Sequence, residues 1–389
     1  MREAFAGVMS PDVSEETRGN TDAPPRVKRI LIGDPLTSAQ VDDQLLPKKM
    51  ALPIFASDAL SSVAYAPQEL VMILLIGGLT FLSFTPIVAV AVVVLLIVVV
   101  LSYRQLIKAY PSGGGDYEVA SKNLGEIPGV IVAAALLVDY VLTVAVSVAS
   151  GVDNIISAVP GLDPLRVELA VGFVILIIIV NLRGVREASL VFAIPTYVFI
   201  GSVGFMIVTG LIRTFLGDAP VASSAEFAVH SEDLGQAAVI LLILRAFSSG
   251  CSALTGVEAV SNGVPAFRTP KVRNAQTTLV LMGSIAACLF AGLTALALIT
   301  GVHYAENPCD LIGFDCSNPQ PSLMAQIASA TFGGGSILFF IIQAATACVL
   351  LLAANTAFNG FPLLGSVLAR DGYAVSYTHL RAHETKANL

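Results

Sequence analysis

The sequence predicts an all-α protein that crosses a membrane several times. Hydrophobic residues make up 55% of the 389 residues and charged residues only 13%, and the mean hydropathy is +0.81. A soluble globular domain carries about 25% charged residues, so this composition is typical of a membrane protein. The net charge of −7 carries no functional weight, because the distribution of Lys and Arg among loops matters more in such proteins.

Eight apolar runs are long enough to be membrane-spanning helices, which need about 20 mainly apolar residues. They are Leu52–Leu79, Pro86–Tyr103, Pro128–Ser150, Leu165–Asn181, Ser189–Ile212, Gln236–Val264, Thr277–Gly301 and Ser336–Asn355. Residues 1–50 are polar and contain no apolar segment of the signal-peptide type. We therefore expect them to form a flexible tail that precedes the first helix.

Basic residues near the helix ends predict the orientation. Alternate loops carry most of them: Lys48, Lys49, Arg104, Lys108, Lys122, Arg183, Arg186, Arg268, Lys271 and Arg273. The loops on the opposite side hold only Arg166 and Arg213. Because Lys and Arg favour the cytoplasmic side, we expect the N-terminal tail to be cytoplasmic and the protein to lie in the cell (plasma or inner) membrane.

Two of the expected helices are interrupted by polar residues. The first contains "FASDALSSVAYA" (55–66) and the sixth contains "RAFSSGCSALTGVEAVSNG" (245–263). Backbone that leaves a helix at membrane depth is tolerated only where it is buried in protein or lines a wet cavity. We therefore predict that both helices are broken and that a binding site lies between them.

The two interruptions also resemble each other. Ala59–Val63 reads ALSSV and Ala253–Val257 reads ALTGV. Paired discontinuous helices in corresponding positions of two halves indicate a midplane transport site. We therefore expect residues 51–213 to form a first five-helix repeat and residues 236–374 to form an incomplete second repeat of three helices.

Among the carboxylates inside these apolar segments, three are candidates for function, namely Asp58, Asp139 and Glu258. Carboxylates in the bilayer are energetically expensive and tend to mark ion pathways or proton relays. We therefore expect all three to act on a transported ion or proton.

Hydroxyl groups accompany the carboxylates on the same helix faces. Asp139, Thr143 and Ser147 are spaced i, i+4 and i+8, and Thr255 precedes Glu258 by three residues, so each set shares one stripe of its helix. Alternatively, these hydroxyls bond to carbonyls of their own helix and bind nothing. The hydroxyl candidates for the site are Tyr65, Tyr140, Thr143, Ser147 and Thr255.

Other charged residues are expected to have structural roles. Glu69 and Arg245 lie in the outer halves of the two interrupted helices, where we expect an ion pair that acts as a gate rather than direct contact with substrate. Asp153 lies near the external end of the third helix and is expected to be solvated.

The cysteines fall into two groups. Cys309 and Cys316 share a loop expected outside the cell, where a disulfide can form; free thiols are the alternative. Cys251, Cys288 and Cys348 lie in apolar helices and are expected to be small buried hydrophobic residues.

The end of the chain differs in character from the rest. "VSYTHLRAHET" (375–385) resembles a translated sequencing adapter and follows abruptly on the preceding segment. We expect residues 375–389 to be non-native, so that His379 and His383 are neither ligands nor catalysts. On this reading the natural chain continues beyond Ala374, and the sequence is a fragment truncated after about eight transmembrane helices.

Four segments together resemble the amino acid-polyamine-organocation (APC) superfamily. They are "FASDALSSVAYA" (55–66), "YPSGGGDY" (110–117), "LTGVEAVSNGV" (254–264) and "ANTAFNGFPLLGSVLARDGY" (354–373). The first is most similar to the KimA-type potassium importers, which are related to the KUP family. The resemblance implies a fold of two inverted five-helix repeats, of the LeuT-like type, in which the ninth and tenth helices are missing here.

The resemblance also implies a function, namely potassium uptake coupled to protons. The ion site of the family maps onto Asp58, Tyr65, Asp139, Tyr140, Thr143, Ser147, Thr255 and Glu258. Potassium and protons are then the transported species, and no cofactor is implied. A cage of carboxylate, hydroxyl and carbonyl oxygens suits a desolvated monovalent cation, whereas Asp58 would repel the carboxylate of an amino acid.

Alternatives of other classes stay open. An amino-acid or polyamine permease would share the fold, because fold does not fix substrate. A sensor or scaffold that binds without transporting is a third reading. An enzyme is not expected, since the sequence shows no nucleophile-base pair, metal-ligand spacing or cofactor motif.

The expected partners are the lipid bilayer and a small cation or amino acid, with a homodimer possible and no nucleic acid.

Overall fold

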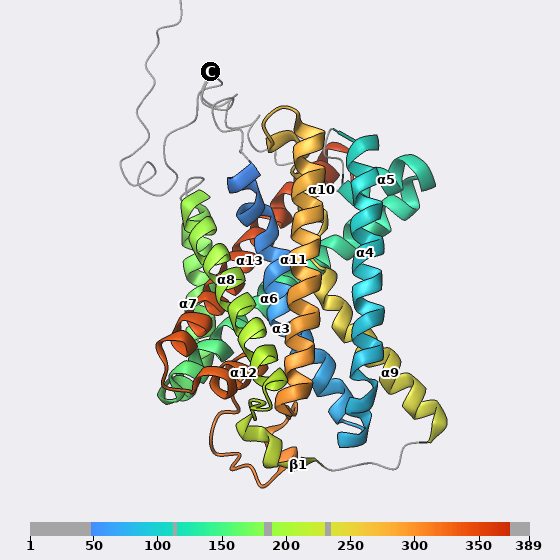
Figure 1. The fold of residues 1–389 in the computed structure, drawn as a ribbon. Helices are drawn as coiled ribbons and strands as arrows, with labels where there is room; N and C mark the ends of the chain where they lie inside the picture. The colour runs from blue at the N-terminus through green and yellow to red at the C-terminus, as the bar shows by residue number, and fades with distance from the viewer. Residues whose placement is uncertain (1–47, 112–114, 183–188, 230–234, 374–389) are drawn as a thin grey trace, which may run out of the picture.

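The computed structural model describes residues 48–111, 115–182, 189–229 and 235–373. In this part the chain is a bundle of long helices, and α4 and α11 stand side by side along it while α13 runs obliquely across it (Figure 1). The strands of the described residues, β1 (Ala228–Val229) and β2 (Leu311–Ile312), form one short antiparallel ladder.

The α-helices are α3 (Lys48–Leu75), α4 (Thr85–Ala109), α5 (Gly115–Leu124), α6 (Glu126–Ala158), α7 (Arg166–Leu182), α8 (Ser189–Phe215), α9 (Gln236–Gly250), α10 (Glu258–Asn262), α11 (Lys271–Thr300), α12 (Leu323–Phe332) and α13 (Ile337–Arg370). The 3-10 helices are η1 (Leu79–Phe84), η2 (Pro160–Leu165), η3 (Ser223–Glu226), η4 (Cys251–Leu254), η5 (Val264–Ala266) and η6 (Pro308–Asp310).

The prediction of an all-α membrane protein is confirmed. Six segments of the described chain are long and apolar enough to span a membrane: Leu79–Ala109, Glu126–Ala158, Ala193–Phe215, Gln236–Asn262, Lys271–Thr300 and Ile337–Arg370. The other two predicted spans are also helical, as α3 and α7. However, α7 has only 17 residues, and α3 contains several polar side chains. The short helices α5 and α12 were not predicted.

The predicted break in the first helix is wrong. α3 runs without interruption from Lys48 to Leu75. The serines that suggested a break instead donate to carbonyls of the same helix: Ser57 Oγ to Ile54 O at 3.2 Å, Ser61 Oγ to Asp58 O at 2.7 Å and Ser62 Oγ to Asp58 O at 3.0 Å. Because a hydroxyl can bond within its own turn, these residues are accommodated without unwinding.

The predicted break in the sixth helix is present. α9 ends at Gly250, η4 follows, Thr255 is extended with φ −61° and ψ 147°, and α10 begins at Glu258. Gly256 has φ +81°, a conformation that other residues adopt only with strain. A Cβ at this position would lie 2.7 Å from Cβ and Cγ of Asp58. The break therefore packs directly against α3.

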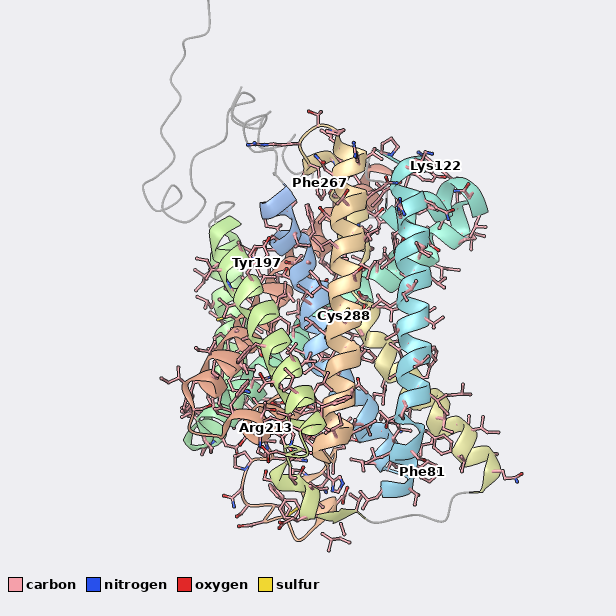
Figure 2. All side chains as sticks on the ribbon, viewed as in Figure 1. Phe81, Lys122, Tyr197, Arg213, Phe267 and Cys288 are labelled. Atoms are coloured by element: carbon pink, nitrogen blue, oxygen red, sulfur yellow. A yellow bond between two sulfur atoms is a disulfide. The ribbon has the colours of Figure 1, made fainter. Side chains whose placement is uncertain are left out.

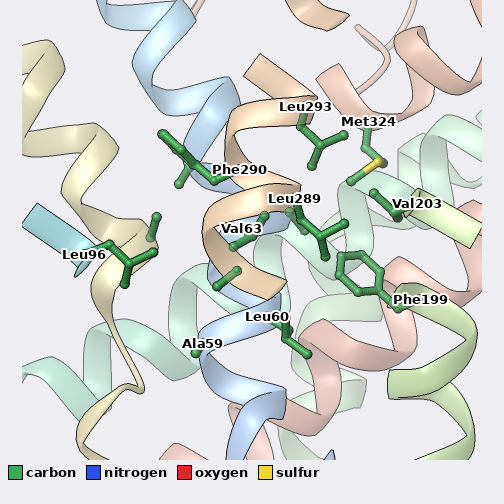
Figure 3. Close-up of a cluster of buried hydrophobic side chains, with 14 of the residues drawn as sticks. Ala59, Leu60, Val63, Leu96, Phe199, Val203, Leu289, Phe290, Leu293 and Met324 are labelled. Atoms are coloured by element: carbon green, nitrogen blue, oxygen red, sulfur yellow. The ribbon is translucent and has the colours of Figure 1, made fainter. Parts of the chain in front are cut away.

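The hydrophobic core surrounds α3. Leu60 of α3, Leu96 of α4, Phe199 of α8, Phe290 of α11 and Met324 of α12 are all at most 1% exposed and belong to one cluster (Figure 3). Five elements that are distant in sequence therefore bury their apolar faces at one place. This packing fixes the backbone of α3 on the side away from its polar residues.

The outer surface of the bundle is apolar, as a lipid-facing surface should be. Ile87 on α4 is 69% exposed and Ile131 on α6 is 63% exposed. Cys288 lies on the outside of α11 (Figure 2). Cys288 and Cys348 are exposed and Cys251 is half-buried, so the expectation that these three cysteines are buried is wrong: helix faces that meet lipid need no packing partner.

The two ends of the bundle differ. Lys122 and Phe267 lie at the end that carries α5, and Arg213 lies at the opposite end (Figure 2). At the Arg213 end, the β1–β2 ladder joins two loops, and Cys309 and Cys316 form a disulfide with Cα atoms 5.1 Å apart. Most of the tail over residues 1–50 and all of residues 375–389 lie outside the described residues, and so do His379 and His383.

The disulfide can be tested directly. Digestion of the purified protein without reductant should yield a linked peptide that contains Cys309 and Cys316, while Cys251, Cys288 and Cys348 should be alkylated. Recovery of alkylated Cys309 and Cys316 from unreduced protein would contradict the pairing.

The close contact of Gly256 with Asp58 predicts that Gly256→Ala lowers the melting temperature in detergent by several degrees. A left-handed conformation alone costs a non-glycine residue about 1–2 kcal/mol, and the methyl group would also overlap Asp58. Gly204→Ala on α8 is the matched control, because nothing lies within 4 Å of a Cβ there. Equal melting temperatures for the two variants would show that the packing at Gly256 is loose.

Candidate ion-binding site

Asp58 is the centre of the candidate site. It is 5% exposed, and its Oδ1 is a buried atom without a hydrogen-bond partner among the described residues. Its side chain faces the left-handed turn at Gly256, where the absence of a side chain leaves room for it. α3 thus presents a carboxylate to the non-helical backbone of the sixth predicted span.

A chain of hydroxyls joins α3 to this break. Tyr65 OH donates to Ser62 Oγ at 3.2 Å, Ser62 Oγ lies 2.5 Å from Thr255 Oγ1, and Thr255 Oγ1 donates to Ser252 O at 2.9 Å. The structure therefore brings the predicted residues Tyr65 and Thr255 together through Ser62. Ser62 was not among the predicted site residues, although its position one turn after Asp58 was the available signal.

The third predicted span, α6, contributes the stripe expected from its spacing. Thr143 and Ser147 are buried, and Asp139 and Tyr140 are half-buried. Ser147 Oγ has no hydrogen-bond partner in the described part of the chain. The alternative reading, in which the hydroxyl bonds to its own helix, therefore fails for Ser147. A buried hydroxyl left unpaired is an available oxygen ligand.

The three predicted carboxylates lie within electrostatic range of one another. Asp58 interacts with Asp139, and Glu258 interacts with both. Within the described residues, none of the three forms an ion pair with a Lys, Arg or His side chain. Burying like charges without a basic partner is strongly unfavourable, so a bound cation or bound protons would stabilise this arrangement.

Sequence reasoning missed a second polar group on the side of α5. Tyr103 OH donates to Asp116 Oδ2 at 2.6 Å, and a Cβ at Gly115 would overlap Oδ1 of Asn262, one turn after Glu258. Burial raises the pKa of the Asp116 carboxyl and the hydrogen bond from Tyr103 lowers it. The segment "YPSGGGDY" was the signal, because Gly115 lets the start of α5 approach α10.

The expected gate pair is not formed. No ion pair joins Glu69 to Arg245 in the described residues. Glu69 is half-buried on α3 and lies within electrostatic range of Glu306, whereas Arg245 is exposed on α9. The two side chains therefore lie in different surroundings.

Asp153 is paired rather than solvated, so that expectation is wrong. Its carboxylate forms an ion pair with Arg166, which also pairs with Asp163 at 3.0 Å. Asp153 is half-buried near the end of α6. The 3-10 turns of η2 bring the start of α7 back beside α6, which sequence spacing alone did not indicate.

The donor atoms around Asp58 define what the site can bind. They are the carboxylate oxygens of Asp58 and the hydroxyl oxygens of Ser62 and Thr255, which meet at the break. Among the described residues, no three His, Cys, Asp or Glu side chains are close enough together to hold a metal ion. A set with one carboxylate and neutral oxygens is of the kind that suits a monovalent cation.

Known proteins of this type are transporters. The family model "Amino acid permease" matches residues 51–387. A protein of Bacillus subtilis (strain 168) named potassium transporter KimA is 45% identical over 353 residues, which cover 89% of this chain and 54% of that protein. The low-affinity putrescine importer PlaP of Escherichia coli (strain K12) is 25% identical over 275 residues, 70% of this chain and 56% of that protein.

The chain spans about half the length of these relatives. The family match covers more than half of the chain, and the matched region contains the candidate site and every described helix after the first turns of α3. The comparisons therefore agree with the reading of the protein as a transporter and not an enzyme. This chain is a multi-pass membrane protein that belongs to the amino acid permease family of the APC superfamily.

Proposed function

We propose that the protein imports potassium together with protons, through a site between α3, α6 and the broken sixth span. The observation that carries the proposal is Asp58: a buried carboxylate with one oxygen that has no hydrogen-bond partner among the described residues, placed against a helix break and beside two further acids. An unpaired charge at membrane depth is costly, and a transported cation would relieve that cost.

The proposed ligands combine charge with neutral oxygens. Asp58, Thr255, Tyr65, Thr143 and Ser147 would offer carboxylate and hydroxyl oxygens in place of the hydration shell of the ion. Asp139, Tyr140 and Glu258 belong to the proposed site as well, although three of its carboxylates do not lie close enough together to hold one ion jointly in the described residues. The name of the Bacillus relative, a potassium transporter, supports potassium as the ion.

Proton coupling would follow from burial. A carboxylate in a low-dielectric site prefers its neutral form, and a nearby cation reverses this preference. Glu258 or Asp139 would therefore alternate between binding a proton and facing potassium, and for inward movement of both it would carry its proton across while Asp58 holds the ion. This alternation would link the two fluxes.

A polyamine importer is the second candidate. The Escherichia coli relatives are named putrescine importers, and an acidic site without a basic partner would also accept an organic diammonium ion. A competition assay separates the candidates: excess putrescine should leave potassium uptake unchanged if potassium is the substrate and should abolish uptake if the site binds polyamines.

We also propose the architecture of the natural protein. Residues 51–213 would form one five-helix repeat and residues 236–374 part of an inverted second repeat, with residues 1–50 on the cytoplasmic side. The paired ALSSV and ALTGV segments support this arrangement.

The first test uses the uninterrupted natural gene and an Asp58→Asn variant. Wild type should rescue a potassium-uptake-deficient bacterium at low external potassium. Asp58→Asn should reduce uptake at least about 100-fold, because it removes the buried negative charge that the bound cation would neutralise. Asp163→Asn, at a half-buried acid on η2 that lies outside the proposed site, is the control and should rescue. Failure of a correctly inserted wild type would refute potassium uptake.

The second test concerns Glu258. In proteoliposomes, Glu258→Gln should remove the dependence of rubidium uptake on an imposed proton gradient, because glutamine cannot exchange a proton. Uptake is measured with and without the gradient. If full dependence persists, Glu258 is not the proton carrier and Asp139 becomes the candidate.

A further inference from the structure

We propose that Gly360 of α13 is a positioning residue for the ion site, because it provides the space that the ring of Tyr140 occupies. The inference rests on the proposed function, in which Tyr140 belongs to the site. Gly360 does not contact the ion itself, and α13 supplies none of the proposed ligands.

The evidence begins with the contact. A Cβ at Gly360 would lie 2.9 Å from Cζ, 3.0 Å from Cε1 and 3.2 Å from Cε2 of Tyr140. Carbon atoms that are not bonded pack at about 3.5–4.0 Å. The edge of the Tyr140 ring therefore rests directly on the backbone of α13, and even one methyl group would displace it.

Glycine is an unfavourable residue inside a helix unless the surrounding structure requires it. Gly360 lies inside α13, where glycine costs roughly 0.5–1 kcal/mol relative to alanine. Gly365, five residues later on the same helix, has nothing within 4 Å of the position of a Cβ. The requirement for glycine is thus specific to the place where Tyr140 touches the helix, and is not a general property of α13.

α13 cannot easily move away from a larger residue. Asn355 Oδ1 accepts from Asn181 Nδ2 of α7 at 2.7 Å, and Thr356 Oγ1 lies 3.4 Å from Ser57 Oγ of α3. These contacts hold the turn before Gly360 on two other sides. A methyl group at Gly360 should therefore move the ring of Tyr140 rather than the helix.

Moving the ring would change the site. Tyr140 interacts electrostatically with Glu258, Asp58 and Asp139, and it lies three residues before Thr143 on the stripe of α6. Displacing its hydroxyl relative to the carboxylates changes the ligand geometry, and a misplacement of about 1 Å can cost a binding or catalytic site up to about 100-fold.

The first part of the experiment tests the contact without transport. Melting temperatures in detergent are measured for Gly360→Ala and Gly365→Ala, each in the wild-type and Tyr140→Ala backgrounds of the full-length natural protein. Gly360→Ala should lower the melting temperature when Tyr140 is present and raise it, or leave it unchanged, when Tyr140 is alanine. Gly365→Ala should behave alike in both backgrounds. An equal loss from Gly360→Ala in both backgrounds would overturn the proposed contact.

The second part tests the role in transport. In rubidium uptake, Gly360→Ala should raise KM at least about fivefold, with a smaller change in the maximal rate, and Gly365→Ala should match wild type. A KM for Gly360→Ala equal to that of Gly365→Ala would overturn the positioning role while wild-type uptake upholds the proposed function. Absence of wild-type uptake would refute the proposed function, and the role in ion affinity with it.

Discussion

Burial of the Asp58 carboxylate is the constraint on which the rest of the site depends. A carboxylate removed from water loses several kcal/mol of solvation unless partners replace it, and here one oxygen is left without a partner among the described residues. The neighbouring structure accommodates this group sterically, through Gly256, and not electrostatically, since the acids nearest to it carry the same charge. This is why we propose that the site binds a positive charge supplied from outside the chain.

α3 and the sixth span both carry polar residues inside the bundle, and they accommodate these residues in different ways. α3 is packed on several sides by the core, so its serines bond within the helix and the helix stays intact. The sixth span is half-exposed along α9, and its glycine and threonine leave the helical conformation, which directs backbone groups towards α3. The intact helix α3 and the non-helical segment of the sixth span therefore face each other at Asp58.

Much of this arrangement could be predicted from the sequence. Apolar run length gives the spanning helices, and costly intramembrane acids together with i, i+4 spacing identify Asp58, Asp139, Glu258 and the stripe on α6. Composition alone could not tell a serine-rich intact helix from a broken one, because hydroxyls stabilise either. It also could not reveal contacts between distant segments, such as those of Tyr103 with Asp116 or Arg166 with Asp153, which depend on how loops fold back.

The length of α13 has a mechanical consequence. Its 34 residues extend over about 50 Å, well beyond the roughly 30 Å of the hydrocarbon core, and the helix lies obliquely (Figure 1). Because the helix is long, a rotation of about 10° around its middle would move each end by about 4 Å. Such a displacement exceeds the range of a hydrogen bond and would separate Asp371 from Tyr117 of α5, which now donates to it at 2.6 Å. A small change of tilt at mid-membrane would thus release α5 at the end of the bundle.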